Sequence, residues 1–512
     1  MAIANRSPSA GPEATSDPRP HAIVIGSGFG GLAAAVRLGA RGWRVTILEK
    51  LDAPGGRAYV FRQDGFVFDA GPTIVTAPYL LDELWALAGR SVSQDVDLRR
   101  IDPFYLIRFD DGVTMRCTGD LDAMRAEVAR LAPSDVAGFD RYIRESERIF
   151  RVAFTELADQ PFHQFTTLAR TAPDLLRLRG YRTVYSRVCD FFRDERMRVA
   201  FSFYPLLIGG NPMSTTAYYC LIAHLERIHG VHYAMGGMGS LVRGILGLAE
   251  RLGARIRYDA QVAKILVEDG RACGVALATG ERIDADIVVS NADAAWTYGK
   301  LLADHPRRRW TDRKLARARY SMGLFVWYFG VDRRFDDVYH HTMLLGPRYR
   351  GLLDDIFGRK VLADDFSLYL HRPTATDPSL APAGCDTFYA LVPVPHLGGG
   401  IDWAERAEPF RQAIQERLER TLLPGLGKAI VTSRVKTPLD FRDRLLSVNG
   451  AGFAMEPNLF QSAWFRPHNV SEELRDLYLV GAGTHPGAGV PGVISSAKVL
   501  DRLVPHGQAW RR

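Results

Sequence analysis

Three glycines near the start of the chain have the spacing that a bound phosphate group needs. Gly26, Gly28 and Gly31 form the pattern Gly-x-Gly-x-x-Gly. In this pattern the first glycine permits a tight turn, the second lets a pyrophosphate approach the backbone, and the third lets a helix pack close to a strand. The helix that follows would aim its free N–H groups and partial positive charge at the phosphates. The pattern therefore predicts a nucleotide-binding site.

The segments around these glycines supply the strand–helix–strand order that such a site requires. Residues 22–25 are a short apolar run typical of a buried parallel strand, residues 32–38 are strong helix formers, and residues 44–48 form a second apolar run. Glu49 closes the second run, where its carboxylate can accept hydrogen bonds from a ribose and would repel a 2′-phosphate. We expect an adenine dinucleotide other than NADP. The alternative is a glycine-rich turn in an unrelated α/β domain.

The residues after Glu49 favour a flavin over a nicotinamide. Residues 55–57 are Gly-Gly-Arg, and residues 69–72 are Asp-Ala-Gly-Pro. The two glycines let a second loop reach the cofactor, and Arg57 can offset pyrophosphate charge; the alternative for Arg57 is a surface arginine. The second segment has the character of a turn brought close to a flat ring.

Two distant stretches complete the predicted cofactor site. Residues 477–497 are a strand, a loop rich in glycine and proline, and a helix start near Gly492. The positive end of that helix would stabilise the negative charge of a reduced flavin; the alternative is a long connecting loop. Residues 286–293 end a strand in polar residues, and Val262 could reach adenine through its backbone. A generic meander would look similar.

These stretches predict an α/β protein whose Rossmann-like, glutathione reductase-like domain binds FAD. We expect a disordered tail at 1–20, a discontinuous FAD domain at 21–75, 233–299 and 446–505, a helical cap at 76–232, and an inserted α+β substrate domain at 300–445. The predicted cofactor contacts are Gly26, Ser27, Gly28, Phe29, Gly30, Gly31, Glu49, Lys50, Gly55, Gly56, Arg57, Gly71, Pro72, Thr73, Val262, Asn291, Gly483, Thr484, Gly492 and Val493.

Composition limits the other possibilities. The chain has 512 residues and a formal net charge of +7, and no 18 consecutive residues are apolar, so we expect no membrane-spanning helix. The polar first twenty residues lack the apolar core of a signal peptide, which favours a cytoplasmic protein. The five cysteines are scattered without a Cys-x-x-Cys pair, so neither a disulfide framework nor a metal site is expected. No basic run or motif indicates nucleic acid.

Taken together, the three glycine-rich stretches resemble the flavin-containing amine oxidase and phytoene desaturase superfamily, and bacterial-type phytoene desaturases in particular. The resemblance extends over residues 21–500. Its further motifs lie at residues 207–212, 367–373, 393–398, 464–469 and 481–489. The resemblance implies non-covalent FAD and a C40 hydrocarbon, phytoene, into which double bonds are introduced stepwise to give neurosporene, lycopene or further products.

The resemblance also implies roles for individual residues. Contacts to the nucleotide part of FAD would come from Gly26, Gly28, Gly31, Glu49, Gly56 and Arg57. Contacts near the isoalloxazine would come from Gly71, Pro72, Gly492 and Val493. One departure stands out: many superfamily members carry an Asp after the late strand to bind the ribityl chain, whereas residues 481–484 here are Gly-Ala-Gly-Thr. That contact would be absent or would move to the backbone and Thr484.

A hydrocarbon substrate requires a long apolar site in which shape supplies the selectivity. Residues 321–330 are a dense apolar run with the length of one strand, which could line such a site on one face or be an ordinary buried strand. Residues 166–212 mix arginines with aromatic and aliphatic residues, as a helix at a membrane surface would. The alternative is an amphipathic cap that faces its own core. We expect the protein to associate peripherally with the inner membrane.

The predicted chemistry leaves several points open. Desaturation needs hydride loss to the flavin and proton loss from the neighbouring carbon, and the sequence does not identify the base. His371, His468 and His485 are the candidates, although each could be structural. Oxygen or a quinone would reoxidise the flavin. A flavin amine oxidase acting on a soluble amine and a non-catalytic prenyl-binding carrier are the alternative functions.

Overall fold

A parallel sheet gathers three segments that lie far apart in the sequence. The computed structural model describes residues 17–510, so most of the predicted tail at 1–20 lies outside the described residues. The sheet has the order β19-β13-β1-β2-β9, and all neighbours are parallel. Its strands are β1 His21–Ile25, β2 Arg44–Leu48, β9 Arg255–Arg257, β13 Ile287–Ser290 and β19 Leu477–Leu479.

The strands of this sheet are apolar at consecutive positions, as is typical of a parallel sheet that is buried on both faces. Ala22 and Val24 of β1 pack against helices α1 Phe29–Ala40, α9 Met238–Arg251 and α16 Val490–Lys498, while Ile23 faces the opposite side. A three-stranded antiparallel sheet covers that opposite side. Its strands are β10 Val262–Glu268, β11 Arg271–Leu277 and β12 Arg282–Asp284.

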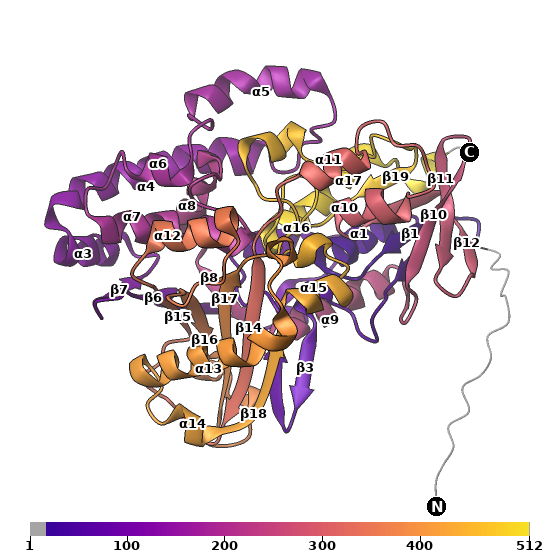
Figure 1. The fold of residues 1–512 in the computed structure, drawn as a ribbon. Coiled ribbons are helices and arrows are strands. Elements are labelled where there is room, and N and C mark those ends of the chain that lie inside the picture. Colours follow the sequence, from indigo (N-terminus) through magenta and orange to yellow (C-terminus); the bar gives the residue numbers. More distant parts are fainter. Residues whose placement is uncertain (1–16, 511–512) are drawn as a thin grey trace, which may run out of the picture.

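A second sheet of seven strands, ordered β18-β14-β17-β16-β15-β6-β7, forms the other half of the molecule (Figure 1). Its strands are β6 Tyr105–Arg108, β7 Thr114–Cys117, β14 Gly323–Val331, β15 His341–Leu344, β16 Leu368–His371, β17 Asp386–Val394 and β18 Ile430–Lys436. All neighbours are antiparallel except β15 and β6. Because β6 and β7 come from residues 76–232, this sheet crosses the boundary between the predicted cap and the predicted substrate domain.

Strand β14 shows why this sheet can be covered on both faces. It matches the apolar run expected at 321–330 and is buried at every position. Phe325, Trp327 and Phe329 pack on the face that carries helix α13 Trp403–Thr421. Leu324 and Tyr328 point to the other face, where they meet the hairpin of β3 Val60–Gln63 and β4 Phe66–Asp69. Alternation along one strand thus separates a structural core from an inner wall.

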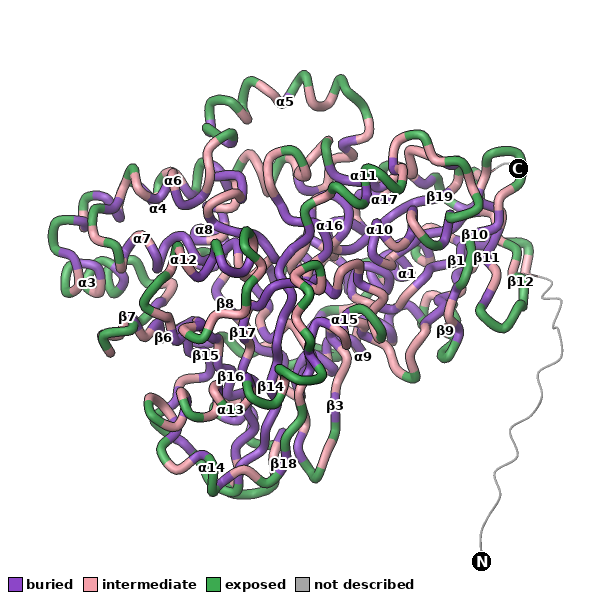
Figure 2. The backbone as a smooth tube through the Cα atoms, viewed as in Figure 1, coloured by how far each residue is buried: buried purple, intermediate pink, exposed green. Residues whose placement is uncertain are grey.

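Helices from residues 121–229 form a cap at the upper left of Figure 1. They are α3 Leu121–Leu131, α4 Val136–Phe150, α5 Phe165–Arg177, α6 Val184–Val188, α7 Glu195–Ser202 and α8 Leu221–His229. Helix α5 stands apart at the top of Figure 1, and Figure 2 shows most of it as exposed or intermediate. The other helices of the described chain are α2 Pro78–Ala86, α10 Ala294–Trp296, α11 Asp312–Arg317, α12 Tyr349–Leu353, α14 Leu426–Ala429, α15 Pro438–Asp443 and α17 Leu500–Leu503. The remaining strands are β5 Leu98–Ile101 and β8 Val231–Ala234.

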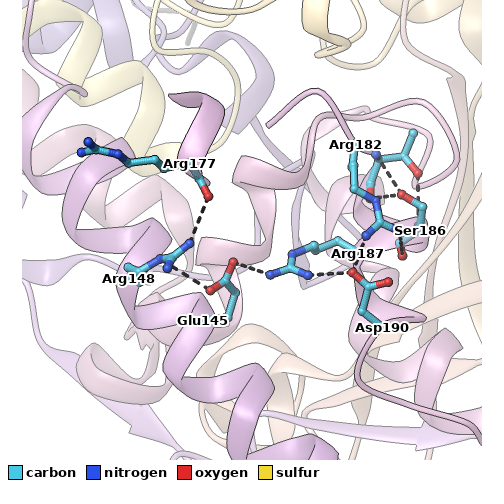
Figure 3. Close-up of polar contacts among 8 residues, drawn as sticks. Glu145, Arg148, Arg177, Arg182, Ser186, Arg187 and Asp190 are labelled. Atoms are coloured by element: carbon cyan, nitrogen blue, oxygen red, sulfur yellow. Dashed lines mark hydrogen bonds and ion pairs between the residues drawn. The ribbon is translucent and has the colours of Figure 1, made fainter. Parts of the chain in front are cut away.

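Ion pairs account for several of the cap's arginines. Figure 3 shows Arg187 between Glu145 of α4 and Asp190, with N–O distances of 2.6 Å to each. Arg148 of α4 donates to the carbonyl of Arg177 at the end of α5, at 3.2 Å. These arginines therefore join cap helices to one another. Among residues 17–510, no helix has the length and hydropathy that crossing a membrane requires.

Candidate functional site

One cavity of about 530 Å³ lies between the two sheets and the cap. Its size is in the range of small-molecule and cofactor sites. Loops at the carboxyl ends of β1, β2 and β13 line one end, together with the loop before α16. Cap helices and the inner face of the seven-stranded sheet line the other. The cavity therefore joins a glycine-rich end to an apolar end.

The glycine-rich end has free backbone donors. Helix α1 begins after Gly28, which has no side chain that could cap the helix. The first turn of α1 contains no acidic residue. Its first N–H groups and its positive dipole end thus face the cavity without a competing anion. Gly26 has φ +87°, which permits the tight turn. A Cβ on Gly31 would lie 2.1 Å from the carbonyl oxygen of Gly26, so α1 packs against the turn only with glycine there.

Glu49 closes β2 as a buried carboxylate at the cavity wall. Its oxygens accept hydrogen bonds from the backbone N–H of Ser27 at 2.8 Å and of Leu51 at 2.9 Å. The Ser27 hydroxyl also donates to it, at 2.5 Å. An ionised carboxylate has about four acceptor sites, so this one can still accept from a ribose.

Arg57 is an internal arginine of the cavity wall, which rules out the surface alternative. Its guanidinium donates to the carbonyl of Gly452 at 2.8 Å and to the hydroxyl of Ser447 at 3.0 Å. Burial lowers the pKa of Arg57, and the Asp293 carboxylate opposes that shift. Burial likewise raises the pKa of Asp293. A half-buried cation with one acid in its vicinity is suited to the charge of a pyrophosphate.

Most predicted contact residues line this cavity. They are Gly26, Ser27, Gly28, Phe29, Gly30, Glu49, Lys50, Gly55, Gly56, Arg57, Gly71, Pro72, Thr73, Val262, Asn291, Gly492 and Val493. Gly31, Gly483 and Thr484 do not. Gly31 is covered by the turn at Gly26, and a Cβ on Gly483 would lie 2.8 Å from Ala294.

The expected contact of Thr484 with the cofactor is wrong, because the side chain of Thr484 does not line the cavity. That side chain is fully buried, and its hydroxyl donates to the carbonyl of Pro467 at 2.6 Å. The hydroxyl is therefore used to hold the segment at residues 464–469. Gly481 and Ala482, not Thr484, are the residues of this turn that line the cavity.

The apolar end is built from alternate residues of adjacent strands. Tyr369 and Leu391 are direct neighbours across β16 and β17, and both line the cavity. The other lining residues of the sheet and the cap include Tyr105, Phe154, Leu157, Phe162, Leu175, Phe203, Leu206, Leu221, Ile222, Leu225, Leu324, Met343, Leu345, Leu368, Tyr389 and Pro393. Such a wall offers few hydrogen bonds, so it selects by shape.

Glu226 is the residue of this wall that the sequence analysis missed. It lies on α8, is buried, and accepts a hydrogen bond from the Tyr105 hydroxyl at 2.6 Å. Burial raises the pKa of Glu226 to about 8, and the Tyr105 bond opposes that shift. The carboxyl is therefore mostly neutral at pH 7 and adds no full charge to the apolar end. Its place beside Leu225 and Leu221 on an amphipathic helix was the signal available in the sequence.

The three candidate histidines differ in whether they line the cavity. His485 lines the cavity, its Nε2 lies 3.1 Å from the carbonyl of Leu157, and burial lowers its pKa to about 4. It is thus neutral at pH 7. His468 lies outside the lining, with Nε2 at 2.9 Å from the Trp464 carbonyl. His371 also lies outside the lining, on β16.

A parallel sheet with a glycine turn at the start of α1, an acid at the end of β2 and a half-buried arginine defines a dinucleotide-binding oxidoreductase. The chain belongs to the flavin containing amine oxidoreductase family, whose profile matches residues 29–499. This membership confirms the predicted fold class and FAD as the cofactor.

Similar proteins span the whole chain. A neurosporene-forming phytoene desaturase of Cereibacter sphaeroides is 51% identical over 99% of this chain and 98% of its own length. A lycopene-forming phytoene desaturase of Pseudescherichia vulneris is 47% identical over 94% and 98%. A solved putrescine oxidase has a TM-score of 0.62 at 17% identity, over 96% of this chain and 97% of its own. An oxidoreductase of Methanosarcina mazei has a TM-score of 0.64 at 18% identity, over 94% and 99%.

The residues at the glycine-rich end fit FAD. The uncapped start of α1 and the Arg57 guanidinium would hold the pyrophosphate, and Glu49 would hold the adenosine ribose. The start of α16, where Gly489 precedes Val490 without a side-chain cap, would face the ring. A Cβ on Gly492 would lie 2.6 Å from the Gly487 carbonyl, so the loop needs glycine to fold over this helix start.

Proposed function

We propose that this chain is a phytoene desaturase: it introduces C=C bonds stepwise into phytoene with FAD as the oxidant. The observation that carries the proposal is the continuous cavity, whose apolar end begins where the flavin-binding loops end. A C40 hydrocarbon needs a wall without unmet polar groups. The aliphatic and aromatic wall, with neutral Glu226 in it, meets that need. Nearly full-length similarity to phytoene desaturases supports the same substrate.

Bound FAD would supply the acceptor for the hydride that one carbon of the reacting bond loses, and the proton of the neighbouring carbon would leave to a base or to water. The chain's own residues position the substrate and exclude water from it. Tyr369, Tyr389 and Leu391 form a wall on one side of the apolar end, and Leu225 of α8 lies in the opposing cap. Holding the reacting bond in place provides much of the rate enhancement, because no polar group of the substrate has to be activated. Within residues 17–510, His485 and Glu226 are the acid–base side chains that line this end besides its tyrosines.

We further propose that the cap docks on the surface of the inner membrane. Large exposed apolar side chains lie on two segments that also line the cavity. Phe165 and Leu176 of α5 are 66% and 63% exposed, and Phe460 is 73% exposed. Phe165 packs edge-on against Trp464, which joins α5 to the segment at 459–465. Leu175, Ser462 and Ala463 of the same two segments line the cavity, so a lipid-dissolved substrate would meet its opening there.

Expression in cells that accumulate phytoene tests the proposed activity. We expect coloured polyenes whose absorption reports the length of the chromophore. Leu391→Glu places a carboxylate in the wall and should abolish the pigment while the protein retains flavin. Val431→Ser, at an exposed position on β18, should leave it unchanged. Flavin-loaded wild-type protein that yields no pigment, or that oxidises amines instead, would contradict the assignment. Oxygen and a quinone, the two expected acceptors, can be compared by the rate at which each reoxidises the reduced protein.

A further inference from the structure

Three histidines meet behind the wall of the cavity. His341 begins β15 and pairs directly with His371 at the end of β16, while His340 immediately precedes β15. Their side chains are all more than nine-tenths buried. The ring centroids lie 4.4 Å apart for His340 and His341, 4.9 Å for His340 and His371, and 5.2 Å for His341 and His371. Antiparallel pairing of two strands thus places three imidazoles in one buried cluster.

The cluster has ring nitrogens without partners. Nδ1 of His340 lies 2.6 Å from the Thr376 hydroxyl, and Nδ1 of His341 lies 2.6 Å from the Tyr369 hydroxyl. The Nε2 atoms of both rings find no partner within residues 17–510. Neither nitrogen of His371 reaches a described partner at hydrogen-bond geometry, although the His340 backbone lies close to its ring. A buried polar atom left unpaired destabilises the fold, so four such atoms in one place indicate a missing ligand.

The chemistry of the cluster selects a metal cation. One nitrogen from each ring lies within 4.8 Å of the other two. All three rings are buried, and burial favours the neutral imidazole, which presents a lone pair. Imidazole nitrogen suits zinc and its neighbours in the first transition row, whereas calcium and magnesium require oxygen ligands. The bonds of Nδ1 to Thr376 and Tyr369 are the outer contacts that orient a ligating histidine and leave Nε2 free.

Carboxylates balance the cation that lies beside the cluster. The Arg372 guanidinium lies beside His340, but it is neutralised by Asp386 at 3.1 Å and Asp336 at 3.1 Å. Asp69 is a buried carboxylate whose Oδ1 has no partner in the described chain. Burial raises the pKa of Asp69 to about 6, so it is largely ionised at pH 7. The Tyr233 ring, packed 4.8 Å from that of His340, lies within range of the Asp69 charge.

We propose that His340, His341 and His371 form a buried site for a divalent transition-metal cation of the zinc class. Zinc–nitrogen bonds of about 2.0–2.1 Å place tetrahedral ligands about 3.4 Å apart, so nitrogens now within 4.8 Å of one another would approach by at most about 1.4 Å on binding. The metal would lock β15 to β16 and fix Tyr369, whose hydroxyl lies 2.7 Å from that of Thr73 on the cavity wall. It touches neither cofactor nor substrate, so its role is to position that wall.

Metal analysis of the full-length, tag-free protein tests the site. Protein purified without chelators, and a chelator-treated sample reloaded with ZnCl2 and desalted, are measured by inductively coupled plasma mass spectrometry. We expect about one zinc-class ion per chain. His341→Gln and His371→Gln should lower that content at least about tenfold, because two imidazoles hold zinc far more weakly than three. His305→Gln, at a partly buried histidine outside the cluster, should retain the metal.

A second measurement covers variants that fail to fold. Zinc added to chelator-treated wild-type protein should raise its melting temperature, because a ligand that binds only the folded state stabilises it. Wild-type protein that contains less than about a tenth of an equivalent after reloading, and whose melting temperature zinc does not raise, would overturn the proposal. So would histidine variants that fold and bind zinc as the wild type does. Both measurements are independent of desaturase activity, so the proposed function could fail while this site stands.

Discussion

Replacing Glu226 by Gln tests whether the apolar end of the cavity is uncharged. Burial holds the carboxyl in its neutral form up to a pKa of about 8, whereas its ordinary value is 4.5. Between these two values the folded state binds a proton that the unfolded state has released. Stability must therefore fall as pH rises through this window, by about 1.36 kcal/mol for each pH unit.

The expected size of the effect follows from that slope. From about pH 5 to about pH 7.5 the wild type should lose about 3 kcal/mol of unfolding free energy relative to Glu226→Gln. Glutamine has the same shape, keeps an acceptor for the Tyr105 hydroxyl 2.6 Å away in the wild type, and cannot ionise. The variant should thus be the more stable protein at neutral pH, and it should retain flavin.

Urea unfolding of both proteins across this pH range measures the difference. Glu268→Gln, at an exposed glutamate on β10, controls for the loss of one negative charge and should run parallel to the wild type. If the curves of Glu226→Gln and wild type stay parallel from pH 5 to pH 8, the carboxyl is charged in the folded protein. The argument for an uncharged hydrocarbon site would then fail.

Three further changes test other parts of the site. Gly31→Ala puts a Cβ 2.1 Å from a backbone oxygen, and overpacking of this kind costs about 1–3 kcal/mol or more; purified protein should contain less flavin and melt at a lower temperature. Arg57→Met removes a cation of the cavity wall and should weaken FAD binding at least about tenfold, measured by flavin fluorescence. Unchanged affinity would refute the role of Arg57 at the pyrophosphate. The double change Phe165→Ser and Leu176→Ser should lower co-sedimentation with anionic liposomes several-fold, whereas Val431→Ser, a similarly exposed apolar position away from the cap, should not; equal loss in both would contradict docking through α5.

The sequence by itself determined the local chemistry of the cofactor end. The spacing of Gly26, Gly28 and Gly31 and the position of Glu49 specify a turn, a helix start and an acid within one strand–helix–strand unit, so short-range geometry sufficed. The apolar run at 321–330 likewise became β14. The resemblance predicted that the loop before α16 lies at the cofactor end. It was wrong for Thr484, whose hydroxyl donates to the carbonyl of Pro467, 17 residues earlier in the chain.

Only the tertiary structure decided which distant side chains share a space. β6 and β7 were predicted within a helical cap, yet they complete the sheet that carries Tyr369. Glu226 meets Tyr105 across 121 residues, and its neutral form depends on burial by elements from the whole chain. His341 and His371 are 30 positions apart without metal-site spacing, and strand register makes them neighbours. Periodicity and spacing report contacts along the chain, whereas contacts and burial between elements arise from packing, which no local pattern contains.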